Sequence, residues 1–307
     1  MLESQTAKIA LQLSLGEREV QATIDLLDSG ASLPFIARYR KEATGNLDEV
    51  AIARIRDLLL RLRQLEERRE AILHSLSKRN LLTDDLREKL LAADTLARLE
   101  DIYLPFRPKR KTRATAAKER GLEPLAKKIF AQDHGDLDPE KEAIAFVNPE
   151  KGVASAKEAL AGARDIMAEW MSEDAEARSR MRILYQSQGV LRSVATAGKE
   201  ADASKFRDYL DWFEPVTRTS PHRLLAMLRG VRAGVLNLHV TPSEEDGLAV
   251  LEELFIKRDG LAADQVRLAA EDGYRRLLAP SMENETLAAA RANAEEKAIE
   301  IFSENLR

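Results

Sequence analysis

The fold class follows from residues 46–80, NLDEVAIARIRDLLLRLRQLEERREAILHSLSKRN. Apolar residues recur at three- and four-residue spacing from Ile55 to Leu76, and Arg and Glu fill the other positions. This period places the apolar residues on one face of an α-helix. Asn46 and Glu49 resemble a capping box at the start, and the asparagine at the end breaks the pattern. The stretch therefore predicts one long amphipathic helix.

A second helix is expected directly after it. Thr83 is placed to cap this helix, and Asp84 and Asp85 fall in its first turn, where the helix dipole favours negative charge. Residues 46–100 are therefore predicted to form antiparallel helices joined by a short loop.

Helical spacing continues through most of the chain, and two segments differ from it. VLRSVAT (190–196) and VLNLHVT (235–241) alternate and are β-branched, so they are predicted to pair as a two-stranded ribbon with helices packed on it. The remaining helices are expected near 119–131, 139–147, 153–171, 174–187, 203–213, 220–230, 243–257, 263–278 and 283–306. The predicted fold is mainly α, a multi-helical scaffold with a minor β element.

The domain boundary is predicted at residues 131–139, AQDHGDLDP, which are polar and rich in turn residues. Residues 1–130 carry 25 basic and 20 acidic side chains, a net charge of +5, and residues 131–307 must then carry −9 to give the total of −4. A nucleic acid is therefore expected to dock on the first region rather than the second.

Several classes of protein are disfavoured by what the sequence lacks. It has no cysteine, its four histidines are scattered, and it has neither a phosphate-binding P-loop nor a G-x-G-x-x-G fingerprint. It also has no apolar run long enough for a membrane span and no signal peptide at its start. We expect a cytoplasmic protein with no enzymatic activity, no cofactor, no bound metal and no membrane partner.

The segment 102–118, IYLPFRPKRKTRATAAK, is rich in basic residues and contains no acidic one. Its two prolines disfavour a helix in its first half, and phosphates are natural partners of such an open basic segment. Tyr103 and Phe106 are candidates to stack on unpaired bases, or equally to anchor the segment to the core. A solvated surface loop is the alternative for the whole segment. The candidate phosphate contacts are Arg107, Lys109, Arg110, Lys111, Arg113 and Lys118.

Residues 20–42 have the outline of a helix-turn-helix: an apolar helix that stops at Gly30, then a second helix with Pro34 in its first turn. Phe35, Ile36 and Tyr39 are expected to give the second helix its buried side. The candidate phosphate contacts at its exposed end are Arg38, Arg40 and Lys41. A purely structural helical corner, with Arg38 bonded to helix carbonyls, is the alternative.

Three stretches resemble the N-terminal half of the bacterial Tex family of transcription accessory proteins, which is related to a eukaryotic transcription-elongation factor. They are LPFIARYRKEATGNLDE (33–49), LEDIYLPFRPKRKTRATAAKERGLEPLA (99–126) and SPHRLLAMLRG (220–230). The resemblance implies a helical scaffold with a helix-turn-helix element. It also implies RNase H-like, helix-hairpin-helix and RNA-binding oligonucleotide-fold domains further along the parent protein, of which this chain is expected to be the N-terminal part.

The expected function is therefore that of a scaffold in a Tex-like transcription accessory protein, with weak, sequence-independent contacts to RNA or DNA. The alternative is a docking module for RNA polymerase or another protein of the transcription machinery.

Overall fold

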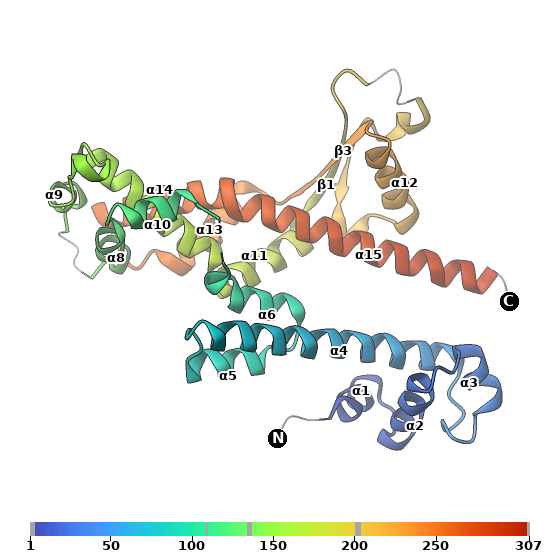
Figure 1. Cartoon of the computed structure of the whole chain (residues 1–307). Helices are drawn as coiled ribbons and strands as arrows, with labels where there is room; N and C mark the ends of the chain where they lie inside the picture. Colours follow the sequence, from blue (N-terminus) through green and yellow to red (C-terminus); the bar gives the residue numbers. More distant parts are fainter. Residues whose placement is uncertain (1–3, 109, 134–136, 200–203, 306–307) are drawn as a thin grey trace. The chain divides into compact units, whose positions relative to one another are not determined.

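The computed structural model describes residues 4–108, 110–133, 137–199 and 204–305. Contacts divide the chain into two compact units, Met1–Phe106 (unit 1) and Arg107–Arg307 (unit 2). Both units are built mainly from helices, which confirms the predicted fold class (Figure 1).

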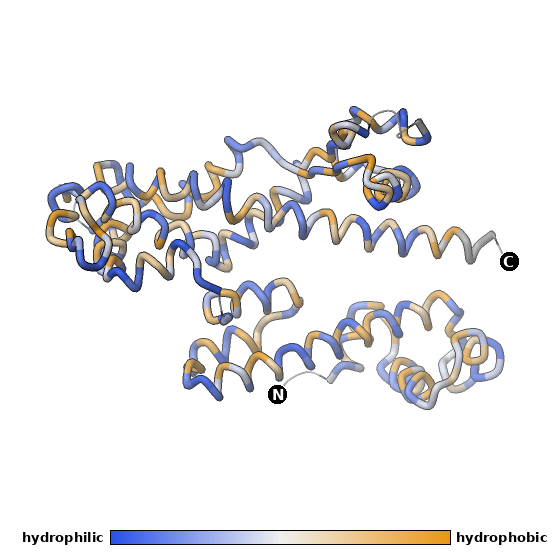
Figure 2. Tube along the Cα trace, turned by 45° about the horizontal axis from the view of Figure 1, so that its top comes forward, coloured by the Kyte–Doolittle hydropathy of each residue, from blue (hydrophilic) through white to orange (hydrophobic). Residues whose placement is uncertain are grey.

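Unit 1 is organised around the long helix α4. The apolar stripe predicted for this helix is confirmed, because Ile55, Leu65 and Ile72 are among its buried residues. Figure 2 shows hydrophobic and hydrophilic residues interspersed along its length. Helices α1, α2, α3, α5 and α6 all contact α4. The helices of unit 1 are α1 Gln5–Leu13, α2 Glu17–Asp28, α3 Leu33–Tyr39, α4 Glu49–Lys78, α5 Asp84–Ala92 and α6 Leu96–Tyr103, followed by the 3₁₀ turn η1 Leu104–Phe106.

The start of α4 differs from the prediction. Asp48 caps the helix, accepting a hydrogen bond from the backbone N–H of Ala51 at 2.7 Å. Asn46 lies in the left-handed region with φ of 64°, whereas an N-cap residue is extended. The predicted cap of α5 is confirmed, since the Thr83 side chain accepts from the N–H of Leu86.

Unit 2 is built around α10, which contacts α7, α8, α9 and α14. Its largest core combines residues from these helices with others from α11, α13 and the start of α15. The helices of this part are α7 Arg113–Glu119, α8 Glu123–Ala131, α9 Pro139–Ile144, α10 Ala156–Glu173, α11 Ala175–Gln188, α13 Glu244–Phe255, α14 Leu261–Gly273 and α15 Ala279–Asn305, with the 3₁₀ turn η2 Pro149–Lys151.

The packing of α7 and α8 on α10 explains why the division falls at Phe106 and Arg107, upstream of the predicted boundary at 131–139. Turn composition marks 131–139 as a connection, but the helices before it share one core with those after it.

Helix α14 runs into α15 through a π-helical segment, Tyr274–Leu278. On one side of this segment, α14 buries small residues and contacts α10. On the other side, Leu287, Ala290 and Ala294 of α15 pack against a core formed with the small sheet.

The small sheet is antiparallel, with strand order β2-β1-β3. The predicted pairing of 190–196 with 235–241 is confirmed as β1 Val190–Ala195 against β3 Leu236–Thr241. The helix predicted near 203–213 is wrong over the described residues 204–213. They form the 3₁₀ segment η3 Ser204–Tyr209 and the start of strand β2 Asp211–Pro215, which pairs with β1. Turn η4 Val216–Arg218 and helix α12 Pro221–Arg232 follow.

Two tyrosines meet in the core of unit 2. The hydroxyl oxygens of Tyr185 and Tyr274 lie 3.4 Å apart, and both side chains are buried. Burial raises the pKa of each phenol, because a buried tyrosinate would lose its hydration.

This pair predicts a loss of stability in alkali. Unfolded tyrosines ionise near pH 10, whereas the folded pair ionises only at a higher pH, so stability is complete below about pH 10 and falls as the pH rises further. We expect the free energy of unfolding to fall above that point by at most about 1.4 kcal/mol per pH unit for each of the two residues. Urea unfolding at pH 9 and pH 11 measures this fall. The Tyr185→Phe, Tyr274→Phe double variant is the control, and an equally steep fall in that variant would contradict the assignment.

Candidate nucleic-acid interface

The turn between α2 and α3 has the predicted local structure. The chain leaves α2 at Ser29, and Gly30 adopts a φ of 84°, in the left-handed region that a glycine enters without strain. Pro34 lies in the first turn of α3, and Ile36 and Ala37 bury the inner side of that helix against Ile52 of α4. Both helices of the predicted helix-turn-helix are therefore present, and its binding to DNA stays a prediction.

The outer side of α3 corrects one prediction. Phe35 and Tyr39 were expected to be buried with Ile36, but they are 40% and 70% exposed. They lie four residues apart, on one face of the helix, with ring centroids 5.5 Å apart. Because α3 has only two turns, its single buried side is filled by Ile36 and Ala37, and the two aromatic rings face outward.

Three basic residues accompany these rings. The Arg40 guanidinium lies 5.4 Å from the centroid of the Phe35 ring, in a cation–π contact. Arg38 and Lys41 are exposed, and within the described part of the chain neither forms an ion pair or a bond to a helix carbonyl. We call these five residues the α3 surface: Phe35, Arg38, Tyr39, Arg40 and Lys41.

Hydrogen bonds hold the backbone just after α3 in place. The buried Thr44 donates from Oγ1 to the Arg40 carbonyl at 3.1 Å, and the Asn46 N–H donates to the Lys41 carbonyl at 2.8 Å. The positions from which Arg40 and Lys41 extend are therefore fixed. One carboxylate, that of the exposed Glu42, lies beside them in the chain.

The basic segment 102–118 is divided by the structure. Tyr103 is buried and Phe106 half-buried in the core of α4, α5 and α6, so these two rings anchor the segment instead of presenting themselves to bases. The side chains of Arg107, Arg110, Lys111 and Arg113 are exposed, and Lys111 forms a surface ion pair with Glu119 at 3.3 Å. Lys109 lies outside the described residues.

Lys118 has an internal partner. It is half-buried, and its Nζ lies 3.2 Å from Oε1 of Glu169, whose side chain is 7% exposed. Thr112, the N-cap of α7, donates to the other carboxylate oxygen at 2.9 Å. The lysine thus neutralises a buried carboxylate between α7 and α10, and we leave it out of the candidate interface.

Arg38, Arg40 and Lys41 are brought together on one turn of unit 1, while the basic residues from Arg107 onward belong to unit 2. The exposed aromatic pair Phe35 and Tyr39 was not predicted from the sequence. The available signal was the shortness of α3, since a helix of two turns that ends well before Gly45 buries only one narrow side.

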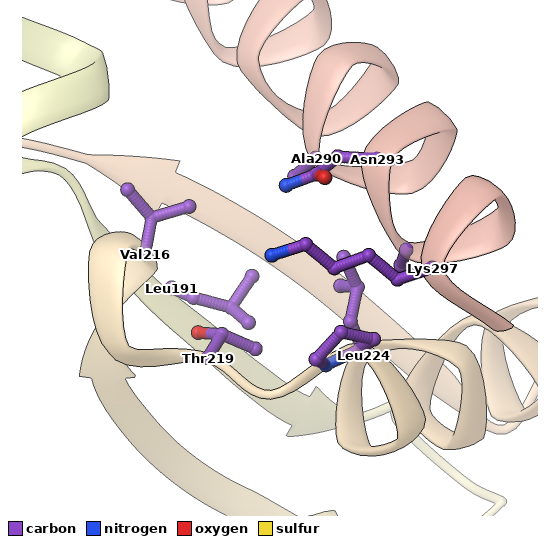
Figure 3. A pocket seen from close by; sticks show the side chains of 9 residues that line it. Leu191, Val216, Thr219, Leu224, Ala290, Asn293 and Lys297 are labelled. Carbon is purple, nitrogen blue, oxygen red and sulfur yellow. The ribbon is translucent and has the colours of Figure 1, made fainter. Parts of the chain in front are cut away.

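One small pocket lies in unit 2 between α15, α12 and β1. Its volume is about 60 Å³, well below the range of roughly 300–1,000 Å³ for ligand sites. Its walls include Leu191, Val216 and Leu224, and Figure 3 shows Lys297 extending across it. We assign no ligand to it. Among the described residues, no three His, Asp or Glu side chains are grouped to hold a metal, and no helix is long and apolar enough to cross a membrane.

These observations define a mainly α-helical scaffold that presents aromatic and basic side chains on one short helix. Sequence comparison gives its family. Residues 3–77 match the Tex-like protein N-terminal domain, and residues 134–302 match the Tex central region-like family. The chain belongs to the Tex family.

Relatives of the chain carry names that refer to transcription and RNA. Protein tex of Bordetella pertussis is 41% identical over 315 residues, and the Transcriptional accessory protein Tex of Neisseria gonorrhoeae is 38% identical over 312 residues. Each alignment covers 98% of this chain and 40% of the relative. The S1 RNA-binding domain-containing protein 1 of Homo sapiens is 25% identical over 301 residues, which are 92% of this chain and 30% of the relative. The chain thus spans about 40% of the length of the bacterial relatives it matches.

Proposed function

We propose that this chain is the helical scaffold of a Tex-type transcription accessory protein and contributes an auxiliary, sequence-independent contact to RNA or DNA. The α3 surface carries the proposal, because it combines exposed rings for stacking on bases with cations for phosphates. The names of the relatives, which refer to transcription and to RNA binding, support the same setting. The proposal assigns the chain no catalytic activity and places it in the cytoplasm.

The basic residues that follow Phe106 are proposed to add charge without stacking. Their aromatic neighbours are in the core, so the remaining interaction with nucleic acid is electrostatic and does not read bases. The stronger contacts of the parent protein are proposed to lie in downstream RNase H-like, helix-hairpin-helix and oligonucleotide-fold domains.

The aromatic pair gives the sharpest test. Exchanging Phe35 and Tyr39 together for Ala should weaken binding of a labelled single-stranded 12-mer about tenfold, because stacking contributes roughly 1–3 kcal/mol per base. Binding of the same sequence as a duplex should change less, since paired bases do not offer their faces. Fluorescence anisotropy measures both affinities. Leu60→Ala, which removes another exposed apolar side chain of unit 1, is the matched control. A double variant that binds the single strand as tightly as this control would contradict the proposal.

The charges are tested by salt dependence. Each lost phosphate contact should flatten the slope of log affinity against log salt by about 0.7 for a single strand. We expect flatter slopes when Arg38, Arg40 and Lys41 are exchanged for Ser, and separately when Arg107, Lys109, Arg110, Lys111 and Arg113 are. Exchanging Lys127, Lys128 and Lys141, which form surface ion pairs elsewhere, is the matched control for net charge. Unchanged slopes in both basic variants would favour a role in docking RNA polymerase or another protein.

A further inference from the structure

The small sheet of unit 2 has one covered face and one open face. Leu191, Val240 and Trp212 belong to a core that the sheet shares with α12 and α15. Residues directly opposite each other on paired strands share a face, and successive residues alternate between faces. The neighbours of these core residues along each strand therefore lie on the other face, which no element covers in the described part of the chain.

One row of side chains crosses the open face. Arg192 of β1 is directly opposite Phe213 of β2 and also opposite His239 of β3. The Phe213 side chain is 73% exposed, and those of Arg192 and His239 are 62% and 55% exposed. An aromatic ring, a guanidinium and an imidazole thus lie side by side on one solvent-exposed face of the sheet. All three groups are planar and stack on nucleobases.

Two carboxylates border this row. Asp211 lies 3.8 Å from Arg192, and Glu283 of α15 lies 2.9 Å from Nδ1 of His239 and also accepts from the Val240 N–H. Glu283 orients the His239 ring, whereas the exposed pair of Asp211 and Arg192 is loose, and both carboxylates offset positive charge in the row. The open face is therefore suited to stacking, and any attraction for phosphates has to come from elsewhere.

Such an attraction is present at one end of the sheet. The chain leaves β1 at this end and enters β2 and β3 there, as the bonds Ala195 N–H to Leu210 O and Thr196 N–H to Val235 O show. The segments that meet at this end carry five basic residues together with the acidic Asp208 of η3, and Glu200 and Asp202 lie in the same connection outside the described residues. We call the five basic residues the basic end of the sheet: Lys199, Lys205, Arg207, Arg229 and Arg232.

The segments of the basic end are in close contact. A Cβ at Gly234 would lie 3.4 Å from Lys199 Nζ, and one at Gly230 would lie 3.1 Å from the ring of Phe206 in η3. Over the part of the chain that the structure describes, none of the five cations forms an ion pair. The sequence from 215 to 243 contains no acidic residue at all. With five basic and three acidic residues over 196–210 and 229–235, this end has a net charge of +2, which favours a polyanion.

We propose that the open face and the basic end together bind a single strand of nucleic acid. An unpaired base stacks on Phe213 beside Arg192 and His239, and the phosphates of the same strand lie at the basic end. Phe213 is three residues from Leu210, or roughly 10 Å along the strand, so one short oligonucleotide reaches both. This site takes the same class of ligand as the α3 surface but shares no residue with it, so each proposal can fail alone.

The test uses the whole 307-residue chain and a fluorescein-labelled 12-mer of oligouridylate. Phe213→Ala should weaken binding about fivefold or more, and Phe213→Tyr, which keeps the ring, should stay within twofold of the unaltered chain. The matched control is Ile183→Ala, which removes another exposed apolar side chain of unit 2. The double variant Arg229→Ser, Arg232→Ser should flatten the slope of log affinity against log salt concentration. The same loss on Phe213→Ala is expected in a chain that already carries Phe35→Ala and Tyr39→Ala.

Ultraviolet cross-linking followed by mass spectrometry gives a direct second readout. The peptide that contains Phe213 should be linked to the oligonucleotide, and the link should persist when α3 is altered. Affinity of Phe213→Ala equal to that of Ile183→Ala, or no link to that peptide, would overturn this site and leave the α3 surface standing. Weaker binding by Phe213→Ala, with unchanged affinity in the Phe35→Ala, Tyr39→Ala variant, would overturn the α3 surface and leave this site standing. No binding by the unaltered chain at low salt would overturn both.

Discussion

Replacing Arg69 with methionine should lower the free energy of unfolding of unit 1 by about 3 kcal/mol, since hydrogen bonds from a charged donor contribute roughly 1.5–3 kcal/mol each. Arg69 lies in the middle of α4 and is 4% exposed. Its Nε donates to the carbonyl of Leu90 at 3.0 Å, and its Nη2 to that of Ala93 at 2.7 Å. Both carbonyls lie at the end of α5, where no further N–H group of the helix is available to bond them. Methionine fills the space but leaves both carbonyls buried and unbonded.

The positions of the two tryptophans make this effect measurable for one unit. Trp170 and Trp212 both lie in unit 2, so tryptophan fluorescence follows that unit, whereas circular dichroism follows the helices of both. In urea, Arg69→Met should shift the circular-dichroism transition and leave the fluorescence transition in place. The control is Arg63→Met on the same helix, whose ion pair with Asp28 is half exposed and contributes less than about 1 kcal/mol. Equal shifts in the two variants would contradict the role of Arg69.

Replacing Lys118 with methionine should destabilise unit 2 by about 2 kcal/mol and change nucleic-acid affinity no more than Lys111→Met does. Removing one partner of a fully buried ion pair costs about 3–5 kcal/mol, and the figure is reduced here because the Lys118 side chain is 30% exposed. Lys111 is matched to it in charge and segment, but its pair with Glu119 is open to solvent, so Lys111→Met should cost less than about 0.5 kcal/mol.

Fluorescence-detected unfolding in urea measures this difference, because Trp170 packs beside Phe130 in the same core as α10. Similar unfolding midpoints for Lys118→Met and Lys111→Met would show that Glu169 does not depend on the lysine. A larger loss of RNA affinity in Lys118→Met would return this residue to the interface.

Long helices were predictable because each of them repeats its pattern over many turns. The stripe of α4 and the Thr83 cap of α5 are local features, and both are present in the structure. Strand β2 was not predictable in the same way. Its five residues carry two acids and a proline, and they form a strand because they pair with β1, about twenty residues earlier in the chain.

The aromatic residues show where sequence reasoning about the site reaches its limit. Tyr103 and Phe35 both stand next to basic residues, yet one is buried and the other exposed. Basic residues follow both rings within four positions, and the difference depends on which side of a helix faces a neighbour. Phe213 is exposed for a comparable reason, since its register with Arg192 follows from the pairing of strands that are distant in the sequence.

The π-helical segment between α14 and α15 has a consequence for how unit 2 is assembled. A π turn accommodates one residue more than an α turn, and one residue rotates a helix by about 100° about its axis. The same continuous helix thereby directs one side of α14 to α10 and a different side of α15 to the sheet. The number of residues in Tyr274–Leu278 sets the rotation about the helix axis between the side that faces α10 and the side that faces the sheet. The identity of any one of these residues matters less.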